Sequence, residues 1–292
     1  MMIFKEQSGK IIMTDFDHFH IGQILECGQC FRFTELSDMH YALIAFGRVL
    51  HIRQLANAVE FYYEGNTLTT DEFNDIWLPY FDLERDYSAI IAKITAGDTV
   101  MQKAVNFASG IRILRQDPWE MLISFIISAN NRIPQIKQVI KNISEAYGTQ
   151  IDLLNYTFPT IEQLLPASQE RLRVLKTGFR DKYIVDATRK AAGGALELSR
   201  DTKIPTDDLR KMLLSVSGVG EKVAHCILLF GYGRMDTFPV DTWVRKVMQQ
   251  YYFDGNDANA TQIHALARER FGELSGFAQQ YLFHYMRMNS GN

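Results

Sequence analysis

The sequence predicts an α+β protein in which a small antiparallel β-sheet domain is followed by a larger all-α domain. Short segments rich in aromatic and β-branched residues gather between residues 20 and 70, which is typical of an antiparallel sheet. Helical patterns dominate from about residue 115 onward. Because 292 residues exceed what most single hydrophobic cores hold, we expect two domains, over residues 1–115 and 116–292.

Four strands are expected in the first domain. Their sequences are CFRF (30–33), YALIAF (41–46), RVLHIRQ (48–54) and VEFYYE (59–64). Gly47 and the pair Gly65-Asn66 supply turns. A helix is expected to follow near residues 86–95.

The second domain is expected to contain a central helix within QDPWEMLISFIISANN. Asp117 is a candidate N-cap, Pro118 takes the first helical position, and Glu120 lies three residues after the cap. Apolar residues surround the helical wheel, which predicts burial on all sides. Further helical patterns cover 133–147, 160–166, 168–176, 180–192, 206–215, 221–231, 242–252, 260–271 and 275–288.

The composition is that of a soluble globular protein, with 47% hydrophobic and 22% charged residues. No apolar run is long enough for a membrane helix, and the first residues lack the features of a signal peptide. Three cysteines favour a reducing compartment, so we expect a cytoplasmic protein. The net charge of −3 argues only mildly against nucleic acid as a partner, because a local basic surface can act within an acidic chain.

Metal-binding patterns are weak. Cys27 and Cys30 form a lone C-x-x-C without a second ligand pair, so we expect buried thiols and no metal site there. The chain also lacks a run of four cysteines for an iron–sulfur cluster.

The segment SGVGEKVAHC (217–226) predicts a helix, a tight glycine turn and a second helix. Gly218 and Gly220 would leave backbone amides at the helix N-terminus open to a phosphate. The spacing fits neither the dinucleotide fingerprint nor the P-loop. Locally, an αα-corner whose glycines serve packing is an equally good interpretation.

Lys222 and Asp241 are the two candidate catalytic residues. Lys222 follows the glycine turn, and the simpler interpretation is that it is a solvated surface charge. A nucleophilic lysine would need its neutral amine, obtained through burial or nearby positive charge. Asp241 precedes an amphipathic helix and suits an ordinary N-cap, but a carboxylate near a lysine could also move protons or stabilise a cationic transition state.

Several segments together resemble one family. SGVGEKVAHC...FPVDTW, IRILRQDPWEMLISFIISANN (111–131), CGQCFRF (27–33), TGFRDKY (177–183) and GFAQQYLFHY (276–285) occur in the order found in 8-oxoguanine DNA glycosylases. These enzymes belong to the helix-hairpin-helix (HhH-GPD) superfamily of base-excision repair, and the chain is most similar to a bacterial branch. The resemblance implies a TBP-like sheet domain, a helix-hairpin-helix glycosylase domain and a monomer that binds double-stranded DNA containing oxidised guanine, without a membrane.

The resemblance also implies roles for individual residues. Lys222 would attack the sugar C1′ and form a Schiff base, and Asp241 would support base expulsion. Gly28 would accept the N7 hydrogen of oxidised guanine, Gln279 would read the base edge, and Phe283 and Cys226 would enclose the base. Asn130 and Arg180 would contact the orphaned partner base, and Phe179 would fill the gap. No cofactor is implied, apart from a structural monovalent ion that the hairpin carbonyls would hold.

Each role has a simpler interpretation that the residue alone also supports. Gly28 suits an ordinary turn, Asn130 a helix end, Gln279 a surface amide and Phe283 a core aromatic. Phe179 and Arg180 suit an exposed aromatic and a surface charge.

Three positions depart from the family pattern, and one of them, Ser217 in place of the usual hairpin proline, is expected to have little effect. Gln135 stands where animal members carry an arginine that enforces cytosine opposite the lesion, so we expect a relaxed opposite-base preference. Trp243 stands in place of a histidine near the lesion phosphate. Other functions stay open: a glycosylase for another damaged base, a non-catalytic helix-hairpin-helix DNA-binding module, or a helical scaffold without a nucleic-acid role.

Overall fold

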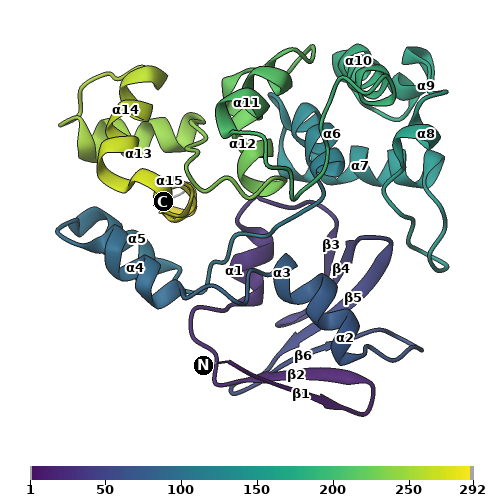
Figure 1. The fold of residues 1–292 in the computed structure, drawn as a ribbon, viewed down its shortest axis with the longest axis horizontal. Coiled ribbons are helices and arrows are strands. Elements are labelled where there is room, and N and C mark those ends of the chain that lie inside the picture. Colours follow the sequence, from purple (N-terminus) through teal and green to yellow (C-terminus); the bar gives the residue numbers. More distant parts are fainter. Residues whose placement is uncertain (1, 290–292) are drawn as a thin grey trace.

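A computed structural model of the protein describes residues 2–289 (Figure 1). A β-sheet forms one end of the molecule and a group of helices forms the other. No described helix has the combination of length and apolar character that crossing a membrane requires.

Within residues 2–289 six strands form one antiparallel sheet in the order β1-β2-β6-β5-β4-β3. They are β1 (Ile3–Gln7), β2 (Lys10–Thr14), β3 (Phe33–Ser37), β4 (His40–Ala45), β5 (Arg48–Gln54) and β6 (Val59–Tyr62). Burial alternates along β4, where Tyr41 and Leu43 face the core. On that face the ring of Phe61 lies 5.1 Å from the ring of Phe73.

The expected strands at 41–46, 48–54 and 59–64 are confirmed, but the strand expected at 30–33 is wrong. The chain has no regular structure at residues 30–32, and β3 begins only at Phe33. Cys30, Phe31 and Arg32 are all buried in succession, because Cys30 joins the core of the sheet while Phe31 joins the core of the helices. A segment that passes between two cores buries consecutive side chains and cannot alternate as a strand does.

Some elements were not anticipated. They are the hairpin β1–β2, the short helices α1 (Ile21–Glu26), α2 (Thr70–Glu72) and α3 (Leu78–Tyr80), the π-helical turn η1 (Phe73–Trp77) and the helix α5 (Thr99–Phe107). The expected helix near 86–95 is confirmed as α4 (Tyr87–Thr95).

The expected helices of the second part are confirmed. They are α6 (Pro118–Ser128), α7 (Ile133–Tyr147), α8 (Ile161–Leu164), α9 (Gln169–Val174), α10 (Asp181–Ala192), α11 (Thr206–Leu214), α12 (Glu221–Phe230), α13 (Thr242–Tyr252), α14 (Ala260–Phe271) and α15 (Ser275–Asn289). The 3-10 turns η2 (Gly178–Arg180) and η3 (Gly272–Leu274) were not expected. Asp117 caps α6, since its Oδ1 accepts a hydrogen bond of 2.8 Å from the amide of Glu120. Nine residues of α6 are buried, as expected for a central helix.

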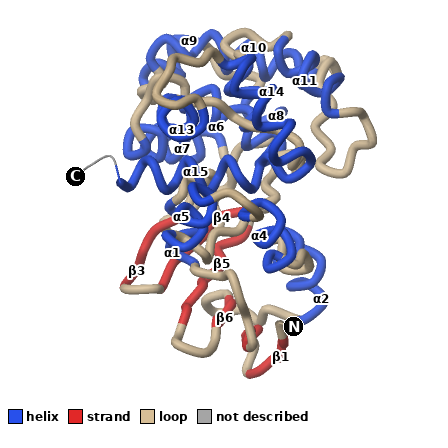
Figure 2. The backbone as a smooth tube through the Cα atoms, turned by 90° about the vertical axis from the view of Figure 1, so that its left-hand side faces the viewer, coloured by secondary structure: helices blue, strands red, loops and turns tan. Residues whose placement is uncertain are grey.

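The helices α4 and α5 lie before residue 115 but share the hydrophobic core of the later helices. The rings of Tyr87 in α4 and Phe277 in α15 lie 5.5 Å apart with perpendicular planes. In Figure 2, α15 runs along the base of the helical part, directly above α5 and α1. This arrangement places the end of α1 against α15, and the candidate site lies at that junction.

Candidate active site

Gly218 and Gly220, the two glycines of the hairpin between α11 and α12, differ in how much space surrounds them. Gly218 adopts a left-handed φ of +83°, and a Cβ atom there would lie 2.5 Å from Cδ2 of Tyr183. Packing alone therefore requires Gly218, as the αα-corner interpretation demands. Gly220 has nothing within 4 Å of its Cβ position, and it begins α12 without a side-chain cap.

Among the described residues, no hydrogen bond uses the amides of Gly218 and Gly220. The Ser217 amide donates to Asp186 instead, at 2.8 Å. Two free amides next to a helix N-terminus form a donor site for an anion. The hairpin thus combines a packing glycine with an open phosphate-type site, and the two interpretations apply to the same turn.

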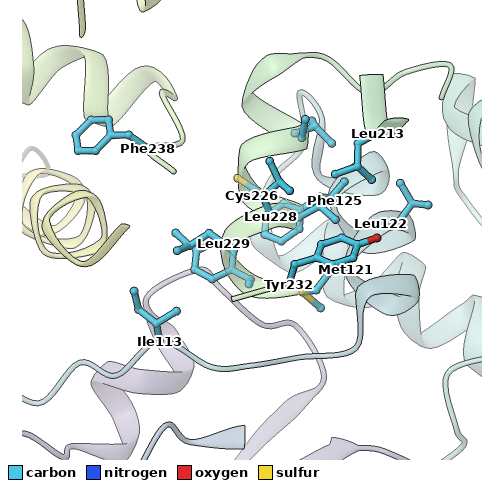
Figure 3. Packing of buried hydrophobic residues seen from close by; sticks show 14 of the residues in the cluster. Ile113, Met121, Leu122, Phe125, Leu213, Cys226, Leu228, Leu229, Tyr232 and Phe238 are labelled. Atoms are coloured by element: carbon cyan, nitrogen blue, oxygen red, sulfur yellow. The ribbon is translucent and has the colours of Figure 1, made fainter. Parts of the chain in front are cut away.

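Lys222 lies in the first turn of α12, half-buried, with its Nζ 5.4 Å above the ring of Phe125 in α6. Cys226 follows one helical turn later, and it belongs to the same buried cluster as Phe125 (Figure 3). Burial raises the pKa of the Cys226 thiol, while the neighbouring Lys222 lowers that pKa and Asp241 raises it further. The lysine, the thiol and the carboxylate therefore lie close enough to act on one another.

Asp241 is both an N-cap and a member of this group. Its Oδ1 accepts a hydrogen bond of 2.8 Å from the amide of Val244, which begins α13. Burial raises the pKa of the Asp241 carboxyl, and the positive charges of Lys222 and Arg287 oppose that shift. The capping contact fixes the orientation of the carboxylate and leaves its second oxygen for another partner.

Gly28 lies in a turn after α1, with a left-handed φ of +83°. The backbone around it is held by side chains. Arg287 donates to the carbonyl of residue 26, Gln280 donates to that of residue 27 at 2.9 Å, and Gln116 donates to that of residue 29 at 2.7 Å. No hydrogen bond between described residues ends on the Gly28 carbonyl. The one unoccupied acceptor of this turn is therefore rigidly positioned.

Gln279 and Phe283 lie one turn apart on α15. Gln279 is buried, and its Oε1 has no hydrogen-bond partner among the described residues. Phe283 contacts the Gly28 turn, since a Cβ atom on Gly28 would lie 3.3 Å from Cε1 of its ring. The sequence suggested a surface amide at position 279, but burial of an unpaired oxygen is typical of a ligand-binding group.

Asn130, Phe179 and Arg180 gather at the end of α6. Asn130 is exposed in a left-handed conformation just after the helix, so the helix-end interpretation applies to its backbone. Arg180 is buried, and its guanidinium donates to the carbonyls of Ala129 and Asn130 at 3.0 Å each. Phe179 is 52% exposed, and the Arg180 guanidinium stacks on its ring at 4.5 Å. Arg180 thus holds the backbone of Asn130 by a hydrogen bond and the ring of Phe179 by stacking.

Two of the departures from the family pattern, Gln135 and Trp243, lie on different helices. Gln135 is exposed in the first turn of α7, close in sequence to Asn130. Trp243 is half-buried in the first turn of α13, with Lys246 4.8 Å from its ring centroid.

Sequence reasoning missed three site residues, namely Gln116, Gln280 and Arg287. All three are polar residues whose partners are backbone carbonyls far away in the sequence, and such a contact leaves no local pattern. The available signal was the position of Arg287 on the same helical face as Phe283, four residues later.

Comparisons with known proteins agree with this arrangement. A family model described as the 8-oxoguanine DNA glycosylase N-terminal domain matches residues 11–122. The model of the HhH-GPD superfamily of base excision DNA repair proteins matches residues 123–273. The chain belongs to the 8-oxoguanine DNA glycosylase family within the HhH-GPD superfamily. The expected family and fold class are confirmed.

Two relatives of this chain are described as an N-glycosylase/DNA lyase or a probable one. A probable N-glycosylase/DNA lyase of Methanothermobacter thermautotrophicus is 32% identical over 231 residues, which are 71% of this chain and 71% of that protein. The N-glycosylase/DNA lyase of Saccharomyces cerevisiae is 30% identical over 257 residues, covering 80% of this chain and 68% of the yeast protein.

A solved member of the family matches over nearly its whole length. It is the Clostridium acetobutylicum 8-oxoguanine glycosylase/lyase in complex with double-stranded DNA containing cytosine opposite 8-oxoguanine. The TM-score is 0.93 at 40% identity, and the match covers 99% of this chain and 98% of that chain.

Proposed function

We propose that this family member is a bifunctional DNA glycosylase and AP lyase that excises 8-oxoguanine from double-stranded DNA. The observation that carries the proposal is the grouping of Lys222, Cys226 and Asp241. Arg287 links this group to the turn whose one free carbonyl belongs to Gly28, because its charge acts on Asp241 and its Nη1 lies beside Gly28. A nucleophile, a fixed carboxylate and a fixed acceptor in one place are what lysine-dependent base excision requires.

Binding of DNA would begin at the hairpin. The amides of Gly218 and Gly220 donate to a phosphate and position the backbone without reading sequence. The target nucleotide then leaves the stack, which costs a few kcal/mol. Phe179, exposed in the middle of η2, enters the gap, and Asn130 and Arg180 lie next to the partner base.

Recognition of the flipped base would rest on a hydrogen that only oxidised guanine has. The Gly28 carbonyl accepts the N7 hydrogen, whereas normal guanine presents a lone pair there and leaves two acceptors opposed. Gln279 reads the edge of the base, and the base lies between Phe283 and Cys226. A carbonyl whose neighbours are all held by side chains cannot move away from the wrong base.

The chemistry would proceed through Lys222. Its neutral amine attacks C1′, the bond from C1′ to the base nitrogen breaks, and the base leaves with the bonding electrons and takes up a proton. The Asp241 carboxylate stabilises the positive charge that develops on the sugar. The ring opens to a Schiff base between C1′ and Nζ, and loss of a C2′ proton expels the 3′ phosphate by β-elimination.

Further properties follow from the same proposal. Without an arginine at position 135, the enzyme has a relaxed preference for the base opposite the lesion. It acts as a monomer in the cytoplasm, on nucleoid DNA if the source is bacterial, and without a catalytic cofactor.

The carbonyls of residues 217–219 accept no hydrogen bond among the described residues, so they suit a monovalent cation of structural function.

Borohydride trapping tests the proposal. Wild-type protein incubated with an 8-oxoguanine duplex and borohydride should form a covalent complex with DNA, because borohydride reduces a Schiff base to a stable amine. Lys222→Gln should abolish trapping. Lys211→Gln is the matched control, since Lys211 lies on the other helix of the hairpin and pairs with Asp208 at 3.0 Å.

The outcomes separate the candidate functions. Trapping that persists in Lys222→Gln would refute Lys222 as the nucleophile. Tight DNA binding without any trapping would indicate a non-catalytic helix-hairpin-helix module. Trapping on a preformed abasic site, but no release of 8-oxoguanine, would indicate a glycosylase for another damaged base.

A further inference from the structure

Arg287 lies beside both Phe283 and the Gly28 turn. It lies one turn after Phe283 on α15, and its guanidinium carbon is 5.3 Å from the centroid of that ring. Its Nη2 donates to the carbonyl of Glu26, two residues before Gly28. One planar group therefore contacts both α15 and the segment that carries the Gly28 turn.

The other nitrogen of the guanidinium is directed at Gly28. Nη1 of Arg287 lies 3.2 Å from the position that a Cβ atom on Gly28 would occupy. This nitrogen is buried and has no hydrogen-bond partner among the described residues. Burying an unpaired donor is unfavourable, so proteins keep such groups where position matters more than local stability.

The charge of Arg287 also acts on the candidate catalytic carboxylate, because it opposes the rise in the pKa of Asp241 that burial causes. Burial lowers the pKa of the Arg287 guanidinium, while the carboxylates of Glu26 and Asp241 act against that shift. No carboxylate forms an ion pair with Arg287 within the described chain. The contact with the Glu26 carbonyl is thus its main anchor, and it ties α15 to a segment 261 residues earlier.

We propose that Arg287 is a specificity-determining positioning residue that fixes the Gly28 carbonyl and the Phe283 ring relative to each other, and so sets the preference for oxidised over normal guanine. This inference rests on the proposed function of the site. A planar guanidinium can donate at its edge while stacking with its face, which a lysine ammonium cannot do.

The test compares two reactions of one variant. Excision of 8-oxoguanine needs the base pocket, whereas cleavage of a preformed abasic site needs Lys222 and bound DNA but no base. Arg287→Met should slow single-turnover excision about tenfold or more relative to abasic-site cleavage, the size expected for losing a hydrogen bond to a charged group. The ratio of oxidised to normal guanine binding, measured with uncleavable analogues, should fall similarly.

Arg85→Met is the matched control. The Arg85 guanidinium also lies 5.3 Å from a phenylalanine ring of α15, that of Phe277, but away from Gly28. This variant should keep the wild-type ratio of the two reactions. Arg287→Lys retains the charge, and it should remain well below wild type.

The results distinguish failure of the inference about Arg287 from failure of the proposed glycosylase function. Equal losses of excision and abasic-site cleavage in Arg287→Met would indicate general damage to the fold and overturn the inference. A ratio matching that of Arg85→Met, or full recovery in Arg287→Lys, would overturn it too. Failure of the wild-type protein to excise 8-oxoguanine would instead refute the proposed function.

Discussion

Gly28 and Phe283 lie in direct contact: a Cβ atom on Gly28 would stand 3.3 Å from Cε1 of the Phe283 ring. The contact joins the end of α1 to α15 across 255 residues of sequence. It defines how far the free carbonyl of Gly28 lies from the ring that would stack on the base. A Cβ atom at position 28 would require Arg287 or the Phe283 ring to shift by a few tenths of an ångström.

Gly28→Ala should weaken discrimination of oxidised from normal guanine by about tenfold or more, because the displaced carbonyl no longer meets the N7 hydrogen. Abasic-site cleavage should be nearly unchanged. Gly65→Ala is the control for backbone strain, since Gly65 also has a left-handed φ of +74° but nothing within 4 Å of its Cβ position. Equal discrimination in the two variants would argue against the proposed role of Gly28.

Asp241→Asn separates capping from catalysis. The amide oxygen of asparagine still caps α13, so thermal stability should change little. Loss of the negative charge should slow base excision on the order of 100-fold, measured under single-turnover conditions. Asp86→Asn, at the N-cap of α4, should leave excision unaffected. Near-normal excision by Asp241→Asn would reduce Asp241 to a structural cap.

Gln135→Arg should narrow the opposite-base preference. A guanidinium at this exposed position near Asn130 would offer paired donors to the acceptors of a cytosine, worth about 1–3 kcal/mol against other bases. Excision rates opposite C, A, G and T should therefore differ more steeply than in wild type. Gln138→Arg, one turn farther along α7, is the matched control. A wild-type enzyme already strict for cytosine would contradict the relaxed preference.

Glu120 should make stability depend on pH. Burial raises the pKa of its carboxyl to about 7, although Arg32 at 3.4 Å opposes the shift. The folded protein thus holds a proton that the unfolded chain releases near its ordinary pKa of 4.5. Stability from this group is fully present below about pH 4.5 and is lost as the pH rises through about 7.

Glu120→Gln should remove this dependence, and at pH 8 it should change the free energy of unfolding in the stabilising direction by up to about 3 kcal/mol. Denaturant unfolding of both proteins between pH 5 and pH 8 measures the effect. Parallel pH profiles for the variant and wild type would show that Glu120 is ionised throughout.

The sequence predicted the helices of the second part well because their signals are local. Asp117, Pro118 and Glu120 mark the start of α6 within four residues, and α7, α13 and α14 begin and end where their apolar periodicity does. The first part was predicted less well. The hairpin β1–β2 was missed, and the segment 30–32 misled because its residues face two cores in turn.

The candidate site also combines features that the sequence predicts with contacts that only the folded structure shows. The sequence by itself determined which residue types are present and in what order: a lysine after a glycine turn, an aspartate before a helix, and segments in the order of one family. Only the tertiary structure decided that the carbonyls around Gly28 are held by Gln116, Gln280 and Arg287, leaving one acceptor free. The physical reason is that caps and periodicity act between neighbouring residues, whereas these side chains meet carbonyls 87 to 261 positions away, which they reach only after the two cores have packed.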